Sequence, residues 1–339
     1  MTENRVDIVL PGVNVELTLK ACLESVVRNS FKEIGIFYVD GGSTDGSIEI
    51  ALCFSQVTVI ERQLKHPTPG LQRNLGWRTG NAPFVQFIDS DTVLDPRWLE
   101  KALTVMRNGV GAVRGNRREM HPDASLFNWI GNLEWNAEPG ECDSFGGDVL
   151  IRREVLDQCG GYDEGLVGGE DPELAQRVRQ AGWKIIQLAE PMTEHDLAMT
   201  TLKQYFKRSY RTGYGYAAVF ARHALRSKGF WLTEIRRIVV RGGGFVLFFG
   251  LGLLGAFWHP AALLAFAPAL FLLLFPRILR VNYFAQAKRL SYQEAKTYAW
   301  HCSLTVLPQF YGVTRFFIGT FIFNCPLKNK RQKIKTGQF

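Results

Sequence analysis

Two spacings of apolar residues alternate along the first 195 positions. Short runs rich in aromatic and β-branched residues predict strands, and apolar residues three or four positions apart predict helices. The predicted strands are residues 5–10, 34–39, 57–60, 84–88, 111–114, 145–151 and 184–188. The predicted helices are residues 16–29, 70–79, 95–107, an irregular one within 123–138, a short one ending at Gly160, and 170–181. This alternation predicts an α/β domain with a doubly wound, Rossmann-like sheet.

The predicted strand at 84–88 runs directly into two carboxylates, Asp89 and Asp91. Ligands of open α/β sheets bind at the carboxyl ends of the strands. The two carboxylates repel each other, and a hard divalent cation that also contacts phosphate oxygens would neutralise them. The same segment could instead be a polar turn, because Asp95 and Pro96 have the pattern of a helix N-cap followed by a first-turn proline.

A glycine-rich loop, Asp40-Gly-Gly-Ser-Thr-Asp-Gly46, follows the strand at 34–39. Its glycines allow tight turns, and its short polar side chains can cap the next helix. The spacings G-x-G-x-x-G and G-x-x-x-x-G-K-[ST] are both absent at the strand ends. A nucleotide bound here would therefore be held in another way.

The composition is uneven along the chain. The formal net charge is +8 and the mean hydropathy is −0.05, but lysines and arginines crowd residues 203–241, 277–296 and 328–335. Long apolar runs lie beside these basic segments, after Gly242. This arrangement favours anionic lipid headgroups over nucleic acid as the partner of the positive charge. Six scattered cysteines indicate a reducing compartment, and the polar N-terminus predicts no secretory leader.

Six short segments occur in a characteristic order. They are Ile8-Val-Leu-Pro-Gly-Val-Asn14, Val39-Asp-Gly-Gly-Ser-Thr-Asp-Gly46, Gly70-Leu-Gln-Arg-Asn-Leu-Gly76, Phe87-Ile-Asp-Ser-Asp91, Gly160-Gly-Tyr-Asp-Glu164 and Gly169-Glu-Asp171. Together they resemble glycosyltransferase family 2, an inverting family with the GT-A fold, a mixed Rossmann-like sheet. The resemblance covers residues 4–195. It implies a nucleotide-sugar donor and a divalent metal cofactor, Mn²⁺ or Mg²⁺.

The resemblance also implies roles for individual residues on the donor side. The substrate-binding positions would be Pro11, Asn14, Asp40, Arg73, Asp89 and Gly147. Asp40 would hydrogen-bond the base, Arg73 would lie near the nucleotide, and Asp89 would lie by the ribose. The metal ligands would be Asp91, chiefly, with Asp89 and His195. His195 could equally be a local hydrogen-bonding residue, and Arg73 could form a salt bridge with an acidic neighbour.

On the acceptor side the resemblance makes Asp171 the catalytic base, with Glu170 beside it to orient the base or bind the acceptor. Asp171 precedes Pro172 and a helical run, so it could instead be a helix N-cap. Two positions depart from the family pattern: Gly41 replaces a second acidic residue, and Asp148 replaces an asparagine. Asp148 would add charge near the acceptor and leaves the acceptor class open.

Residues 200–226 alternate aromatic and cationic side chains at helical spacing, as in a helix at a membrane surface. Packing of this helix on its own domain is the alternative. Processive relatives carry Gln-x-x-Arg-Trp in this region, whereas this chain has Gln204-Tyr-Phe-Lys-Arg-Ser. Transfer of a single sugar is therefore expected.

Two apolar runs, 242–258 and 261–275, predict a helical hairpin that crosses or enters the bilayer. Basic residues flank both sides, so both ends are expected in the cytoplasm. The basic tail at 328–335 then requires an even number of crossings. The segment 303–323, which contains Pro308 and Arg315, is accordingly predicted to be interfacial or re-entrant.

The predicted organisation has four parts: a GT-A domain at 1–199, basic interfacial helices at 200–237, a transmembrane hairpin at 238–279, and a cytoplasmic or re-entrant region with a basic tail at 280–339. The expected activity is metal-dependent, inverting transfer of one sugar from a donor, preferably UDP-linked, to a lipid-linked or polysaccharide acceptor. The expected location is the cytoplasmic face of the inner membrane. The alternatives are a polyprenyl-phosphate sugar transferase and a non-catalytic nucleotide-binding module.

Overall fold

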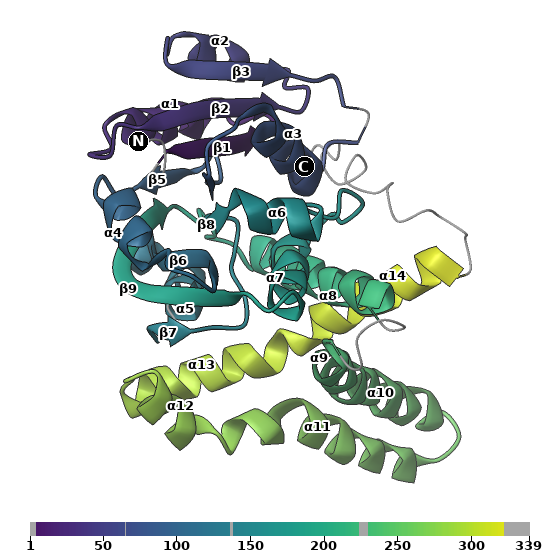
Figure 1. Cartoon of the computed structure of the whole chain (residues 1–339). Coiled ribbons are helices and arrows are strands. Elements are labelled where there is room, and N and C mark those ends of the chain that lie inside the picture. The colour runs from purple at the N-terminus through teal and green to yellow at the C-terminus, as the bar shows by residue number, and fades with distance from the viewer. Residues whose placement is uncertain (1–4, 65, 136–137, 224–229, 322–339) are drawn as a thin grey trace. The chain divides into compact units, whose positions relative to one another are not determined.

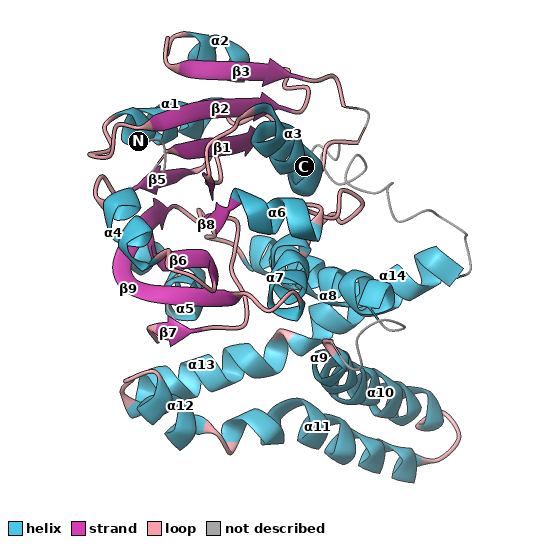
Figure 2. Ribbon diagram, viewed as in Figure 1, coloured by secondary structure: helices cyan, strands magenta, loops and turns pink. Residues whose placement is uncertain are grey.

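The computed structural model describes residues 5–64, 66–135, 138–223 and 230–321 (Figure 1). Contacts divide the chain into two units, the first ending at Ala198 and the second beginning at Met199. The basic tail predicted at 328–335 lies outside the described residues. The first unit combines strands and helices, and the second is helical throughout its described part (Figure 2).

A mixed sheet forms the centre of the first unit. Its strands are β1 Val6–Gly12, β2 Ile34–Asp40, β3 Val57–Glu61, β4 Phe84–Phe87, β5 Thr92–Leu94, β6 Val110–Glu119, β7 Gly140–Glu141, β8 Val149–Arg152 and β9 Lys184–His195. Their order is β3-β2-β1-β4-β8-β6-β9-β5, and β7 pairs with β9. The first four strands in this order are parallel, and β8 is antiparallel to both of its neighbours.

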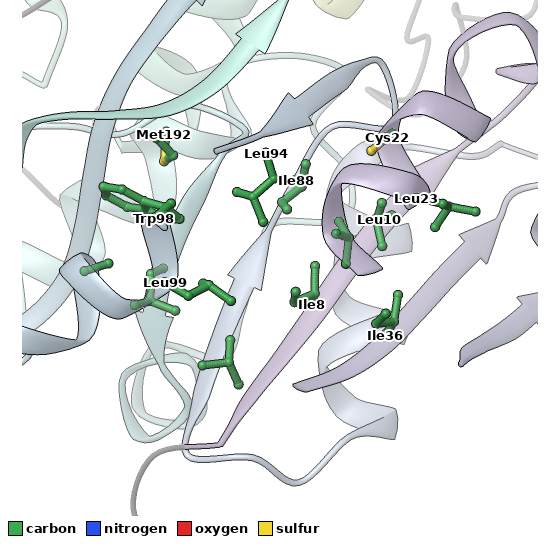
Figure 3. Close-up of a cluster of buried hydrophobic side chains, with 14 of the residues drawn as sticks. Ile8, Leu10, Cys22, Leu23, Ile36, Ile88, Leu94, Trp98, Leu99 and Met192 are labelled. Atoms are coloured by element: carbon green, nitrogen blue, oxygen red, sulfur yellow. The ribbon is translucent and has the colours of Figure 1, made fainter. Parts of the chain in front are cut away.

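Helices cover both faces of this sheet, which makes it doubly wound. The helices are α1 Glu16–Val27, α2 Ser47–Leu52, α3 Pro69–Thr79, α4 Trp98–Val105, α5 Leu126–Trp135, α6 Arg153–Cys159 and α7 Glu170–Gln180. Alternate residues of β1 point to opposite faces. Ile8 and Leu10 pack with Leu23 of α1 and Trp98 of α4 (Figure 3). Val9 packs in a second cluster with residues of α3, α6 and α7.

The sheet topology brings many chain segments to one edge. The parallel strands β1, β2 and β4 all end there. Because β8 is antiparallel to β4, its beginning lies at the same edge, next to the end of β6. The end of β9 runs beside β6, with Arg117 opposite Thr193, and pairs with β5, with Thr92 opposite His195. Residues from distant parts of the sequence therefore meet at one place.

Several predicted boundaries were wrong at this edge. Strands β6 and β9 continue to Glu119 and His195, well past the predicted ends, and the short strands β5 and β7 were not predicted. The second halves of β6 and β9 are rich in polar residues, so the apolar pattern ends before the strands do. The predicted N-cap at Asp95 was also wrong. Helix α4 begins at Trp98, and the Asp95 carboxylate accepts a hydrogen bond from Arg97 N at 2.9 Å.

The second unit consists of helical segments in its described part. They are α8 Leu202–His223, α9 Leu232–Ile238, a π turn Val239–Gly243, α10 Gly244–Gly255, a 3-10 helix Pro260–Ala265, α11 Phe266–Ile278, α12 Val281–Ala287, α13 Tyr292–Leu304 and α14 Val306–Phe321. By length and composition, Leu232–Gly255 and Pro260–Ala287 are long and apolar enough to cross a membrane. Only 22% and 11% of their most apolar windows are buried inside the protein.

Helices α8 and α14 cross at two glycines. A Cβ atom on Gly213 would lie 2.1 Å from Gln309 O, and one on Gly312 would lie 2.2 Å from Tyr210 O. Only glycine permits this close approach of two backbones. Pro308 was predicted to interrupt this segment, but it lies in the first turn of α14, where a proline is tolerated. On the predicted aromatic face of α8, Leu202 and Phe206 are exposed, whereas Tyr210 and Tyr214 contact Tyr311 and Phe316 of α14. The location of this helix at a membrane surface stays a prediction.

Candidate active site

Asp89 lies directly after β4, with its carboxylate between two arginines. Arg73 Nη2 donates to one oxygen at 2.7 Å, and Arg117 Nη2 donates to the other at 3.1 Å. Burial raises the pKa of Asp89, but the two guanidinium groups outweigh that effect and lower the pKa to about 2. Asp89 is therefore a carboxylate fixed in its charged form.

Arg73 is the centre of the charge arrangement. It projects from α3 and is 2% exposed. Besides Asp89, its Nη1 contacts Glu170 Oε1 and Asp171 Oδ1, each at 3.2 Å, and its guanidinium lies 5.3 Å from the ring centre of Tyr162. One buried cation thus serves three carboxylates. The salt bridge considered from the sequence is present, with three partners.

Asp171 lies in the first turn of α7, which begins at Glu170. The N-cap position is Gly169, whose φ of 86° is left-handed, and no side chain caps this end of the helix. Burial raises the pKa of Asp171 to about 8; Arg73 opposes this shift, while Glu170 and Asp89 add to it. Its Oδ1 is buried and accepts no hydrogen bond, although it lies 3.2 Å from Arg73 Nη1. A carboxyl group whose pKa is raised in this way has the proton affinity that a general base needs.

Asp148 and Arg117 together support Asp89. The sequence placed Asp148 near the acceptor and gave no role to Arg117. Asp148 is 2% exposed, and its Oδ1 accepts the Asp89 N–H at 2.9 Å. Its Oδ2 accepts from Arg117 Nε at 3.0 Å and from Thr193 Oγ1 at 2.6 Å. The charge that Asp148 brings is thus neutralised internally. Arg117 and Thr193 lie in the polar ends of β6 and β9, which the apolar pattern did not identify as strands.

Gly147 lies against the same carboxylate. A Cβ atom at this position would be 2.4 and 2.5 Å from the two oxygens of Asp89 and 2.7 Å from Arg73 Nη2. No larger residue fits without moving both groups. Gly147 therefore leaves room for the Arg73–Asp89 ion pair, and its predicted contact with substrate stays a prediction.

Two of the predicted nucleoside-binding residues, Asp40 and Asn14, make hydrogen bonds within the loops after β1 and β2. The Asp40 carboxylate accepts from Gly42 N at 2.7 Å, Ser43 N at 2.8 Å and the Tyr38 hydroxyl at 3.3 Å. Asn14 has a left-handed φ of 56°, and its side-chain oxygen accepts from Thr44 N at 2.8 Å. These bonds shape the glycine-rich loop. The contact of Asp40 with a base stays a prediction.

Pro11 and Gln72 connect neighbouring strand ends. The Pro11 carbonyl accepts from Ser90 Oγ at 2.9 Å, which ties β1 to the loop that carries Asp89 and Asp91. Gln72, which the sequence analysis did not single out, donates to the carbonyls of Gly12 and Val39 at 2.7 and 3.0 Å. Gln72 lies in a run of three polar residues, Gln-Arg-Asn, inside the short helix α3, and all three are buried. Such a run in a short helix was the sequence signal that could have identified Gln72.

Asp91 and His195 are brought together by the pairing of β5 with β9. His195 Nε2 lies 3.2 Å from Asp91 Oδ2, and the Asp91 side chain is 48% exposed. His195 Nδ1 is buried and makes no hydrogen bond. A carboxylate and an imidazole that face each other fit two ligands of a divalent ion, whose other positions substrate phosphates and water can fill.

The third predicted ligand, Asp89, is placed differently. Both of its oxygens are occupied by arginines, and within the described residues no three His, Cys, Asp or Glu side chains group closely enough to hold an ion. Asp89 is part of the ion-pair network, and the roles of Asp91, His195 and Asp89 as metal ligands stay predictions.

Comparison with known proteins gives a consistent result. Residues 7–161 match the family model "Glycosyl transferase family 2". The glycosyltransferase AglE of Haloferax volcanii is 23% identical over 63% of this chain and 74% of its own length. The O-antigen chain rhamnosyltransferase RfbN of Salmonella typhimurium is 21% identical over 62% of this chain and 71% of its own. The chain covers much less of other relatives, for example 15% of the glycosyltransferase GlyA of Streptococcus pneumoniae.

Two solved structures share the fold. The mannosyltransferase PcManGT of Pyrobaculum calidifontis, in complex with GDP-Man and Mn²⁺, has a TM-score of 0.60 at 16% identity and covers 91% of this chain and 87% of its own. The TarS protein of S. aureus has a TM-score of 0.53 at 14% identity, with 88% of this chain and 55% of TarS covered. The fold is thus a GT-A-like mixed α/β sheet followed by C-terminal helices. The chain is a glycosyltransferase, and its residues 7–161 match glycosyltransferase family 2.

Proposed function

We propose that this chain transfers a single sugar from a nucleotide-sugar donor, preferably UDP-linked, to a lipid-linked or polysaccharide acceptor, with inversion of the anomeric centre. The observation that supports this most is Asp171, a buried carboxylate whose pKa is raised to about 8. It shares an arginine with Asp89 at the sheet edge where donors bind in α/β folds.

In the proposed mechanism, Asp171 accepts the proton of an acceptor hydroxyl. The hydroxyl oxygen forms a bond to the anomeric carbon while the bond from that carbon to the diphosphate breaks, and the electron pair leaves with the diphosphate. Arg73 and Arg117 hold Asp89 in place for the donor, and Asp91 and His195 would hold the divalent ion. That ion, when bound, would offset the charge that develops on the leaving diphosphate. The Mn²⁺ in the PcManGT complex supports the use of a divalent metal.

We further propose that the second unit attaches the enzyme to the cytoplasmic face of the inner membrane. Two long apolar helices with little internal burial support attachment, as does the excess of positive charge beside them. The organisation into interfacial helices at 200–237, a hairpin at 238–279 and a terminal region at 280–339 forms part of this proposal.

A donor screen tests the reaction itself. The purified chain would be incubated with UDP-, GDP- and dTDP-sugars and membrane lipid, and free nucleoside diphosphate would be measured. Release that depends on added lipid or glycan supports transfer. If no donor is consumed with any acceptor, the proposed reaction is wrong.

The metal proposal predicts a large effect at Asp91. Asp91→Asn removes the more exposed of the two candidate ligands, and we expect turnover supported by Mn²⁺ or Mg²⁺ to fall below detection while the fold is retained. Donor consumption before and after addition of a chelator measures this. Asp123→Asn, a change at an exposed carboxylate after β6, is the control. Full activity of Asp91→Asn, or of the native chain in excess chelator, contradicts a metal-dependent mechanism.

The topology proposal predicts two shielded sites. Single cysteines at Asn282 and Gln338, in a chain without its native cysteines, should not react with a membrane-impermeant thiol reagent in intact cells, and both should react in opened membranes. Both sites follow an even number of crossings if 303–323 does not span, and Arg315 would cost about 2.5–3.5 kcal/mol at the centre of a spanning helix. Labelling of position 338 from outside would mean three crossings, and labelling of position 282 alone would exclude the hairpin.

A further inference from the structure

Four arginines gather at one end of the apolar helices of the second unit. Arg237 lies on α9 and Arg241 on the π turn after it, whereas Arg277 lies at the end of α11 and Arg280 just beyond. Helices α10 and α11 pack together as a hairpin, which brings these two pairs to the same end (Figure 1). Arg241 and Arg277 are in electrostatic range of each other and of both remaining arginines.

Arg241 fixes the geometry of this cluster. Its side chain is buried, and it donates to the carbonyls of Leu272 and Leu273 at 3.2 and 2.6 Å. Pro276 has no N–H, so the carbonyl of Leu272, four residues earlier, lacks its helical partner. Arg241 supplies that missing donor. Arg241 therefore connects the π-helical segment to α11 and keeps the arginines before α10 close to those at the end of α11.

The cluster has no counter-charge within the described part of the protein. Residues 199–321 contain only two acidic side chains, Glu234 and Glu294. Glu294 is engaged in a capping box with Ser291. Among the described residues, no carboxylate forms an ion pair with any of the four arginines, and Arg237 Nε is buried without a hydrogen-bond partner. Arg241 is buried, Arg237 and Arg277 are half-buried, and Arg280 is exposed. A buried charge is stable only when it is paired, and like charges held close together favour binding of an anion.

The side chains around the cluster indicate which kind of molecule contains the bound anionic group. Large apolar side chains beside it are exposed, among them Val240 at 51%, Phe275 at 43% and Leu279 at 66%. We infer that the arginine cluster, defined by Arg237, Arg241, Arg277 and Arg280, binds the phosphate group of a membrane lipid whose hydrocarbon chains lie along these apolar residues. Guanidinium groups suit this ligand because their paired donors match two phosphate oxygens. This inference rests on the proposed membrane attachment.

Lipid binding to the full-length chain in detergent tests the inference. Native mass spectrometry would measure retention of three added lipids: phosphatidylglycerol, a polyprenyl monophosphate, and phosphatidylcholine, whose headgroup has no net charge. The test variant is Arg277→Gln with Arg280→Gln, which leaves the helix contact of Arg241 intact. The matched control is Arg289→Gln with Lys296→Gln, which removes the same charge at two exposed positions outside the cluster.

We expect the test variant to bind anionic lipid at least about tenfold more weakly than the native chain, and the control to match the native chain. Equal loss for both phosphate lipids indicates a general headgroup site, and loss for the polyprenyl lipid alone indicates a carrier-lipid site. Equal retention by test and control variants overturns the inference.

A separate vesicle-flotation measurement distinguishes this inference from the proposed membrane attachment. A native chain that does not float with vesicles contradicts membrane attachment. A test variant that floats normally but retains lipid like the control contradicts only the arginine cluster.

Discussion

Replacing Asp171 by asparagine is expected to slow sugar transfer by roughly 10²–10⁴-fold, the usual contribution of a general base. Binding of the donor should remain close to that of the native chain, because asparagine keeps the shape of the side chain and Arg73 keeps two other carboxylates. Transfer rates and donor dissociation constants, measured on the same preparations, separate the two effects. Asp157→Asn, at an exposed position on α6, is the control.

The raised pKa of Asp171 gives this prediction a pH dependence. The base works in its charged form, so kcat/KM of the native chain should rise with pH and level off above about 8. The folded-state pKa is above the ordinary value of 3.8, so the contribution of this group to stability falls as pH rises from about 4 to 8. Asp171→Asn removes that loss and should unfold at the same or a higher temperature than the native chain at pH 9. A less stable variant with normal turnover would mean that Asp171 has only a structural role.

Replacing Arg73 by methionine is expected to lower both stability and activity strongly. Removal of one partner from a buried ion pair costs about 3–5 kcal/mol, because the remaining charge is left uncompensated. Here three carboxylates lose their shared cation. Chemical denaturation measures the loss, which should be larger at pH 8 than at pH 5, where the carboxylates can take up protons more easily. Transfer activity should be lost as well.

A matched control for this change lies on the same helix. Arg78 pairs with Glu164, but its side chain is 49% exposed, so Arg78→Met should cost less than about 1 kcal/mol. Arg73→Lys keeps the charge and loses the paired donors, and we expect it to recover part of the stability but little of the activity. If Arg73→Met and Arg78→Met were equally stable, the ion-pair network would not hold the site together.

The sequence predicted the site as far as strong local patterns extend. The run from Phe84 to Asp91 combines a buried strand with carboxylates at its end, and the alternation of strands and helices predicts parallel strands joined by right-handed crossovers. Arg117 and Thr193 could not be found in this way. They lie in strand segments with polar composition, whose pairing depends on neighbours more than 70 residues away. The contact between Asp91 and His195 also depends on pairing between distant strands. It could not be predicted from the hydrophobic pattern, because the three-residue strand β5 is too short to produce one.

The helical unit shows a similar limit. Its apolar runs were evident from composition, because hydropathy is a local property. The face of α8 that packs was not evident. It depends on Gly213, which faces α14, and on small residues such as Ser209 as well as on aromatic side chains. Pro308 was wrongly predicted to interrupt the segment. A proline disrupts the middle of a helix but is tolerated in the first turn, and the sequence pattern did not show that α14 begins at Val306.

The glycine crossing of α8 and α14 also sets the order in which the protein can fold during synthesis. Gly213 and Gly312 are about a hundred residues apart, and at roughly 5–20 residues per second the ribosome needs about 5–20 s to make the chain between them. The apolar helices α10 and α11 emerge within that interval, before the helix that closes their unit exists. Until α14 arrives, the packing face of α8 has no partner from this crossing. This interval is when the nascent chain most needs a membrane or a chaperone to cover its apolar surface.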